Sequence, residues 1–245
     1  ALPRRSAAGE PYQGTEDDAV KRLFGSPEKS WLIASVIACG LLLGSLFVPL
    51  WRMELVAPQY PAGLVMRAYG YKFAGDADTY YDDVREINGL NHYIGMKPIK
   101  KVTEMSLFVP GVLALIAGTL LGSFVAWKRR WLRALLILGF WTMPVFFVAD
   151  LQYWLYHYGH TMNPEAPLNT GSFTPKVMGT TKVWNFHSQT GFEIGFYLML
   201  AAAIEITVVP LAFSWWQRRH VLAVVPRDEA GAPDRGAPAR RRVVA

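Results

Sequence analysis

The amino-acid sequence predicts an all-α integral membrane protein with four transmembrane helices, both chain ends in the cytoplasm (N-in/C-in) and a small irregular cap on the periplasmic side. Apolar residues make up 52% of the 245 residues, and the mean hydropathy is positive. These residues gather in four blocks, each as long as the roughly 20 residues that a bilayer core requires. Lysine and arginine are distributed unevenly between the segments that connect the blocks.

The predicted helices are residues 31–51, 107–127, 131–154 and 192–216. Each block ends in a tryptophan, and aromatic rings of this kind prefer the headgroup level of a bilayer. Residues 1–30 are polar and charged, and the first block is longer than the apolar part of a signal peptide. We therefore expect the first block to remain in the protein as a helix.

Positive charge predicts which connections face the cytoplasm. Residues 1–30 contain five lysines and arginines, the turn at 128–133 contains four, and residues 217–245 contain seven. The other two connections share the remaining nine, which acidic side chains nearly balance. The positive-inside rule therefore places both termini and the turn in the cytoplasm, and the chain as a multi-pass protein of a bacterial inner membrane.

The net charge of +6 is explained by this topology, so no nucleic-acid partner is expected. Residues 1–30 are predicted to form a cytoplasmic N-terminal segment, and residues 217–245 a basic cytoplasmic tail. Proline, glycine, alanine and arginine dominate the end of this tail. That composition predicts either disorder near anionic lipid or a contact with the cytoplasmic face of a partner.

Two periplasmic loops, residues 52–106 and 156–191, are predicted to form the cap. Both are rich in glycine, proline and asparagine, so any regular elements within them are expected to be short. A single helical turn at 82–87 and an extended strand at 64–73 are the candidates. Loops of this length are usually functional or held by a partner.

Histidine and methionine are concentrated in these loops, which contain four of the five histidines and six of the eight methionines. Imidazole and thioether groups are copper ligands, particularly for Cu(I). The candidate ligands form two groups: His92 with Met96, which would share a face if they lay on one helix, and His157 with His160 and Met162. Two other interpretations remain open: a structural, hydrogen-bonded cap with methionine as a gap filler, and non-covalent haem ligation by one histidine, since no C-x-x-C-H motif is present.

Two carboxyl groups in the helical blocks are predicted to make intramembrane polar contacts. Glu205 lies near the centre of the last block, where a charge that faces lipid costs at least about 2.5 kcal/mol. We expect its partner to be a proton pathway, another subunit's helix or a hydroxyl group of the bundle, the candidates being Ser35, Ser45, Thr119 and Thr142. Asp150 lies near the outer end of the third helix, where it fits a hydrogen bond to a histidine or the surroundings of a metal site.

Known catalytic signatures are absent from the sequence, which contains no Walker loop, dinucleotide fingerprint, HExxH motif or nucleophile elbow. The helical blocks contain few polar residues and no internal repeat, which argues against a secondary transporter. We therefore expect a protein that is not an enzyme.

Two strings, Ala57–Leu64 (APQYPAGL) and Ile87–Pro98 (INGLNHYIGMKP), together with Tyr158-Gly159-His160, resemble a family of bacterial four-helix membrane proteins. The family is associated with accessory genes for copper-dependent nitrous oxide reductase and with other respiratory genes. The resemblance covers roughly residues 31–216. It implies a role around a membrane electron-transfer system and favours copper at His92, Met96 and His160.

Three functions follow as expectations. The first is a non-catalytic accessory subunit of a multisubunit membrane electron-transfer complex, respiratory or photosynthetic, whose partners are the other membrane subunits and lipid. The second is a periplasm-facing copper-handling assembly factor for a copper respiratory enzyme. The third is an enzyme or quinone-site protein that uses Glu205 for proton transfer.

Overall fold

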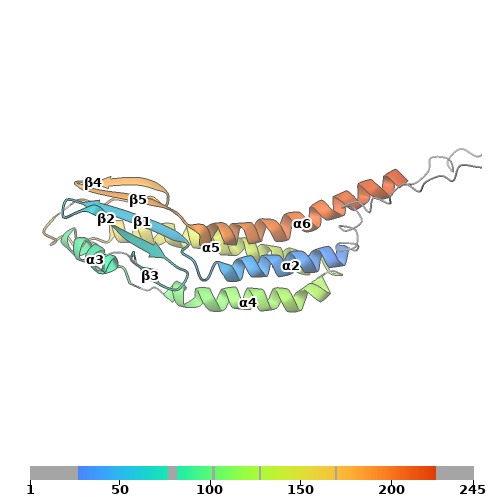
Figure 1. The fold of residues 1–245 in the computed structure, drawn as a ribbon. Helices are drawn as coiled ribbons and strands as arrows, with labels where there is room; N and C mark the ends of the chain where they lie inside the picture. The colour runs from blue at the N-terminus through green and yellow to red at the C-terminus, as the bar shows by residue number, and fades with distance from the viewer. Residues whose placement is uncertain (1–26, 77–81, 101–102, 127, 169, 225–245) are drawn as a thin grey trace, which may run out of the picture.

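The computed structural model describes residues 27–76, 82–100, 103–126, 128–168 and 170–224. Four long helices run side by side, and a five-stranded antiparallel sheet extends from one end of them (Figure 1). The prediction of an all-α protein with an irregular cap is therefore wrong, because the two predicted loops form this sheet. Residues 1–26 and 225–245, most of the two predicted cytoplasmic segments, lie outside the described residues.

The long helices are α2 (Pro27–Gly44), α4 (Thr103–Ala126), α5 (Arg130–His160) and α6 (Ile194–Val224). Three stretches, Glu104–Ala126, Arg130–His160 and Ile194–Trp216, are long and apolar enough to cross a membrane. The helix α2 is not among them. It has 18 residues, and its first turn contains Glu28, so its apolar part is shorter than that of the other three.

The first helix ends earlier than residue 51, where the sequence predicts its end. After Gly44 the Ser45 hydroxyl donates a hydrogen bond to Leu42 O (2.7 Å), and the chain turns. Pro49 follows, and its missing N–H prevents a helix from continuing. Trp51 then begins a strand. By contrast, α5 and α6 extend beyond their predicted ends at 154 and 216.

The four helices form a ring in which each contacts two others. Both α2 and α5 contact α4 and α6. The interior contains small and apolar side chains that allow close approach of the helices; they include Ala38, Leu42, Val112, Phe140 and Met199.

The sheet has the strand order β3-β2-β1-β5-β4. The strands are β1 (Trp51–Ala57), β2 (Tyr60–Ala68), β3 (Phe73–Ala74), β4 (Gly179–Val183) and β5 (Phe186–Phe192). The central strands come from distant parts of the chain, since β1 follows α2 and β5 precedes α6. Trp51 lies opposite Phe192 where both strands meet their helices, so two paired strands continue into two contacting helices.

One face of the sheet is covered and the other is polar. The helix α3 (Asp83–Tyr93) and the end of α5 pack on the covered face, whose core includes Trp51, Leu64, Met66, Ile87 and Leu90. The polar face has two ion pairs: Arg52 with Glu54 (2.9 Å), and Arg67 with Asp76 (3.2 Å). The hydrogen bond to the Asp76 carboxylate raises the pKa of the Arg67 guanidinium above its ordinary value.

Two glycines allow close approach between parts of the chain at the sheet end of the molecule. Gly95 has φ +81°, and its carbonyl accepts a hydrogen bond from Asn163 N (2.7 Å). At Gly159, near the end of α5, a Cβ atom would lie only 1.8 Å from Phe173 O. Both glycines belong to the strings that carry the family resemblance, so part of those strings serves chain packing.

Candidate functional site

Two cavities lie at the sheet end of the molecule, and Tyr158 of α5 lines both. The first, here called the carboxyl cavity, has a volume of about 80 Å³ and lies between α4, α5 and the end of β2. Polar side chains in its lining are those of Glu104, Asp150, Trp154, Lys100, Tyr69 and Tyr158. The second, here called the methionine cavity, has a volume of about 100 Å³ and lies between the sheet, α3 and α5.

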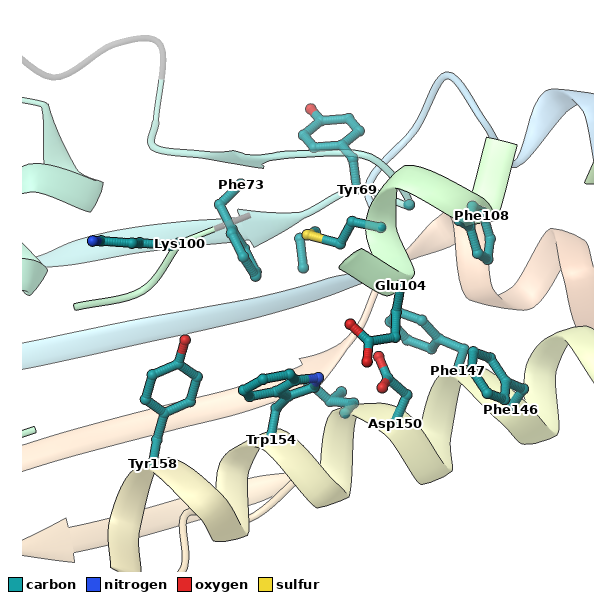
Figure 2. A pocket seen from close by; sticks show the side chains of 14 residues that line it. Tyr69, Phe73, Lys100, Glu104, Phe108, Phe146, Phe147, Asp150, Trp154 and Tyr158 are labelled. Atoms are coloured by element: carbon teal, nitrogen blue, oxygen red, sulfur yellow. The ribbon is translucent and has the colours of Figure 1, made fainter. Parts of the chain in front are cut away.

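Two carboxyl groups face each other in the carboxyl cavity. Glu104 is in the first turn of α4, and Asp150 extends from α5 toward it (Figure 2). The indole N–H of Trp154, one turn further along α5, is buried and directed toward Asp150 without making a hydrogen bond of normal geometry. The cavity therefore combines two carboxyl groups, which accept hydrogen bonds when ionised, with one indole donor that has no partner among the described residues.

Aromatic rings form most of the wall around these carboxyl groups (Figure 2). Tyr69 and Phe73 come from the β2–β3 hairpin, and Phe108 comes from α4. Phe146 and Phe147 come from α5. A small cavity with aromatic walls and two acidic groups has the chemistry of a site for an organic cation.

Three methionines line the methionine cavity. Met53 and Met66 are directly opposite each other on β1 and β2, and Met96 follows α3. The rest of the lining is mainly apolar and includes Trp51, Leu155 and Phe173. Three thioethers around one space are compatible with Cu(I), and also with a gap filled by flexible side chains.

The first predicted ligand group does not share a helix face. The helix α3 ends at Tyr93, so Met96 lies beyond it, while the His92 side chain is exposed to solvent. Met96 instead faces the cavity that Met53 and Met66 line. The sequence alone did not single out these two methionines as partners of Met96, because only the pairing of β1 with β2 brings the three together.

The second predicted group lies at the end of α5. The His157 ring is stacked on Tyr153, and the His160 ring is stacked on Tyr156 with Nδ1 2.9 Å from Tyr156 O. Met162 follows the helix. In the described part of the chain, no three His, Cys, Asp or Glu side chains gather closely enough to hold a metal ion.

Glu205 is in the middle of the apolar stretch of α6. Both of its carboxyl oxygens are covered, and neither has a hydrogen-bond partner among the described residues. Three of the expected hydroxyl partners donate instead to main-chain carbonyls of α2 or α5. They belong to Ser35, Ser45 and Thr142. The fourth, on Thr119, is buried and also has no partner in the described structure.

An exposed indole lies at the tip of the β4–β5 hairpin. Trp184 is 64% exposed and has φ +55°, a conformation that is costly for a bulky side chain. It is the one non-glycine residue with positive φ among the residues that the structure describes. The hairpin thus displays a large aromatic side chain in a position that glycine would occupy with less strain.

No protein-family model matches this chain, and comparison with curated proteins finds no significant match. The resemblance noted from the sequence therefore stays a prediction. Any proposed function must account for the fold. It has three helices long and apolar enough to cross a membrane, and a sheet at one end of them.

Proposed function

We propose that this chain is a non-catalytic accessory subunit of a multisubunit electron-transfer complex in the bacterial inner membrane. Its helices contact other membrane subunits and its sheet faces the periplasm. In this proposal α2 is the fourth crossing, because it contacts α4 and α6 and buries Trp31, Ala34 and Ala38 in the ring. Both termini then lie in the cytoplasm, as the positive-inside rule requires.

Glu205 carries this proposal. Its carboxyl has no hydrogen-bond partner in the described part of the chain, and it lies beside an exposed stripe of α6 that includes Ile204 (43% exposed) and Val208 (51% exposed). An acidic group at the centre of a membrane helix is costly unless it finds a donor. A partner helix packed on this stripe would reach the carboxyl after a change of rotamer and supply that donor.

Trp184 supports a second contact on the periplasmic side. Tryptophan is enriched among residues that dominate protein–protein binding energy. An indole that is exposed despite a strained backbone is explained if burial against a partner subunit offsets the strain. The open polar face of the sheet, with Arg52 and Glu54, would then lie at the rim of this contact.

The test is purification of the full chain from its native membrane in mild detergent, with mass determination and identification of the chains that co-purify. We expect a stable complex from the wild type and a much smaller yield of it from Glu205→Leu. Thr142→Val is the matched control, because the Thr142 hydroxyl donates to Leu138 O of its own helix. A wild-type chain that purifies alone would refute the accessory role.

A second candidate function, the handling of Cu(I) as an assembly factor, is favoured by the three methionines of the methionine cavity. Thioether ligands select Cu(I) over harder ions. If the protein handles Cu(I), the metal is bound by Met53, Met66 and Met96. The side chains of His92 and His160 lie away from this cavity.

Copper loading of the purified protein distinguishes the methionine ligands of the cavity from the histidine ligands predicted from the sequence. Cu(I) is added against a competing chelator, and bound copper is measured per chain. If the methionine cavity binds copper, Met66→Leu lowers the bound amount while the double variant His92→Ala/His160→Ala does not. Copper lost only from the histidine variant would support the ligands predicted from the sequence, and no bound copper would exclude both.

A further inference from the structure

The carboxyl cavity lies at the level where α4 and α5 would leave a bilayer. A bilayer core is about 30 Å thick and a helix rises 1.5 Å per residue, so about 20 residues cross it. Counted from Arg130, the first residue of α5, that length ends at Asp150. Glu104 is the first residue of the apolar stretch of α4. Both carboxyl groups therefore lie at the headgroup level of the same leaflet.

One wall of the cavity reaches the outer surface of the helices. Phe146 lines the cavity, yet 53% of its surface is exposed on the outside of α5. Its neighbour Val145 is 62% exposed and Leu107 of α4 is 65% exposed. A molecule with apolar chains in the bilayer can therefore lie along α4 and α5 with its polar end in the cavity.

The two carboxyl groups of the cavity favour a cation, because Lys100, which also lines the cavity, extends away from them (Figure 2). The facing carboxyl groups of Glu104 and Asp150 repel each other when both are ionised, and a cation between them removes this repulsion (Figure 2). The aromatic rings of Trp154 and Phe73 line the same space, and the face of such a ring attracts positive charge. The volume of about 80 Å³ suits a small headgroup rather than a large soluble ligand.

We propose that the carboxyl cavity binds the ammonium headgroup of a phospholipid of the ethanolamine type, with the acyl chains lying against α4 and α5. A primary ammonium has three N–H donors, enough to serve both carboxyl groups at once. A trimethylammonium group has no N–H donor and leaves the carboxyl oxygens without hydrogen bonds. This inference rests on the membrane crossing of α4 and α5 but not on the identity of any partner subunit.

The experiment uses the full chain reconstituted in nanodiscs of equal parts phosphatidylethanolamine and phosphatidylglycerol. Native mass spectrometry after release then counts the lipids that remain bound. We expect one phosphatidylethanolamine per wild-type chain. Glu104→Gln/Asp150→Asn keeps acceptor oxygens but removes both negative charges, and this loss of charge-assisted hydrogen bonding should lower retention at least about tenfold.

Controls separate the headgroup site from a general effect of charge or folding. Glu165→Gln removes the same kind of charge from an exposed position and should leave retention unchanged. If the double variant fails to fold, the single variant Glu104→Gln, in the first turn of α4, should still lower retention several-fold while keeping the circular dichroism of the wild type. Equal retention of the two lipids, or retention that the variants do not change, would refute the proposal.

A further arm distinguishes the lipid from a free amine with the same chemistry. Phosphoethanolamine is titrated into the delipidated protein and followed by calorimetry. The proposal predicts no heat of binding for this soluble compound at concentrations where the lipid is retained. Tight binding of phosphoethanolamine without retention of the lipid would mean that the cavity takes a soluble ammonium ion, and would overturn the assignment to a lipid.

Discussion

Trp51 of β1 lies opposite Phe192 of β5 at the point where the sheet joins the helices. The pairing continues beyond the strands, since Glu193 N donates to Leu50 O (3.0 Å) and Gly195 N donates to Pro49 O (2.9 Å). Trp51 is only 1% exposed, and its indole N–H donates to Val177 O (2.7 Å). This one side chain thus connects β1, β5 and the segment before β4.

Trp51→Ala should weaken the sheet strongly. Removal of a buried tryptophan costs about 3–5 kcal/mol because a cavity remains. Trp51→Phe keeps most of the ring contacts and loses the hydrogen bond to Val177 O, which costs about 1 kcal/mol. Hydrogen exchange of the β1 and β5 amides measures the loss of sheet stability in both variants. Equal exchange in the two variants would show that packing of the ring contributes little.

Gly159→Ala should displace the segment around Phe173. Alanine has the better helix propensity by about 1 kcal/mol, but a Cβ atom here would lie 1.8 Å from Phe173 O. Backbone movement to relieve such a contact costs about 1–3 kcal/mol. We expect faster proteolysis near residue 173 and a lower melting temperature.

Gly89→Ala is the matched control and should have the opposite sign. Gly89 is exposed on α3, and outside its own helix backbone no atom of the described residues lies within 4 Å of the position of its Cβ. The gain in helix propensity should raise the stability of α3 by about 0.5–1 kcal/mol. A destabilised Gly89→Ala protein would contradict the packing of α3 described above.

Asp83→Ala should destabilise the junction of α3 with β2. The Asp83 carboxylate is 1% exposed and accepts hydrogen bonds from Val65 N (3.1 Å) and Asp76 N (3.2 Å). Loss of the acceptor leaves buried N–H groups without a partner, at about 1–3 kcal/mol. Chemical unfolding in constant detergent measures the change.

The adjacent Asp82 provides a control for Asp83. Its side chain caps α3 by accepting from Arg85 N (3.2 Å). Asparagine caps helices as well as aspartate does, so Asp82→Asn should leave stability within about 0.5 kcal/mol of the wild type. A larger loss would mean that Asp82 acts through its charge rather than as a cap.

Trp184→Gly should make the isolated chain more stable and its complex weaker. Glycine adopts positive φ without the steric cost that tryptophan has, a difference of about 1 kcal/mol or more. If Trp184 contacts a partner subunit, the same change lowers the yield of the co-purified complex. A variant that is more stable and keeps the full complex would show that the indole is not a contact.

The long helices were predictable because apolar blocks of bilayer length leave few alternatives. The sheet was also signalled in part, since Trp51, Met53 and Leu55 alternate with Arg52 and Glu54 along β1. The sequence predicts a helix up to residue 51 because the apolar block runs through Pro49 to Trp51, but the helix ends before this proline and β1 follows it.

The other central strand gives no comparable signal. The residues of β5 that face the covered side include Ser188 and Thr190, so its alternation is hidden. Its pairing with β1 joins positions 141 residues apart at Trp51 and Phe192, and no local pattern specifies such a pairing.

The candidate sites were likewise only partly predictable from the sequence. Asp150 and Glu205 were predicted as polar groups in an apolar setting, whereas Glu104 was not singled out. Glu104 becomes a partner of Asp150 only through the packing of α4 against α5, which side-chain chemistry alone does not determine.

The strands of the sheet come from two distant parts of the chain, so they are made at different times during synthesis. When β1 and β2 leave the ribosome they can pair at once, because a two-residue turn joins them. The edge of β1 that pairs with β5 stays unpaired until α4, α5 and β5 have been synthesised. An unpaired strand edge invites pairing with other chains. Formation of β5 after α5 is therefore the step that covers this strand edge, and a chain truncated before β5 should be a substrate for quality-control proteases.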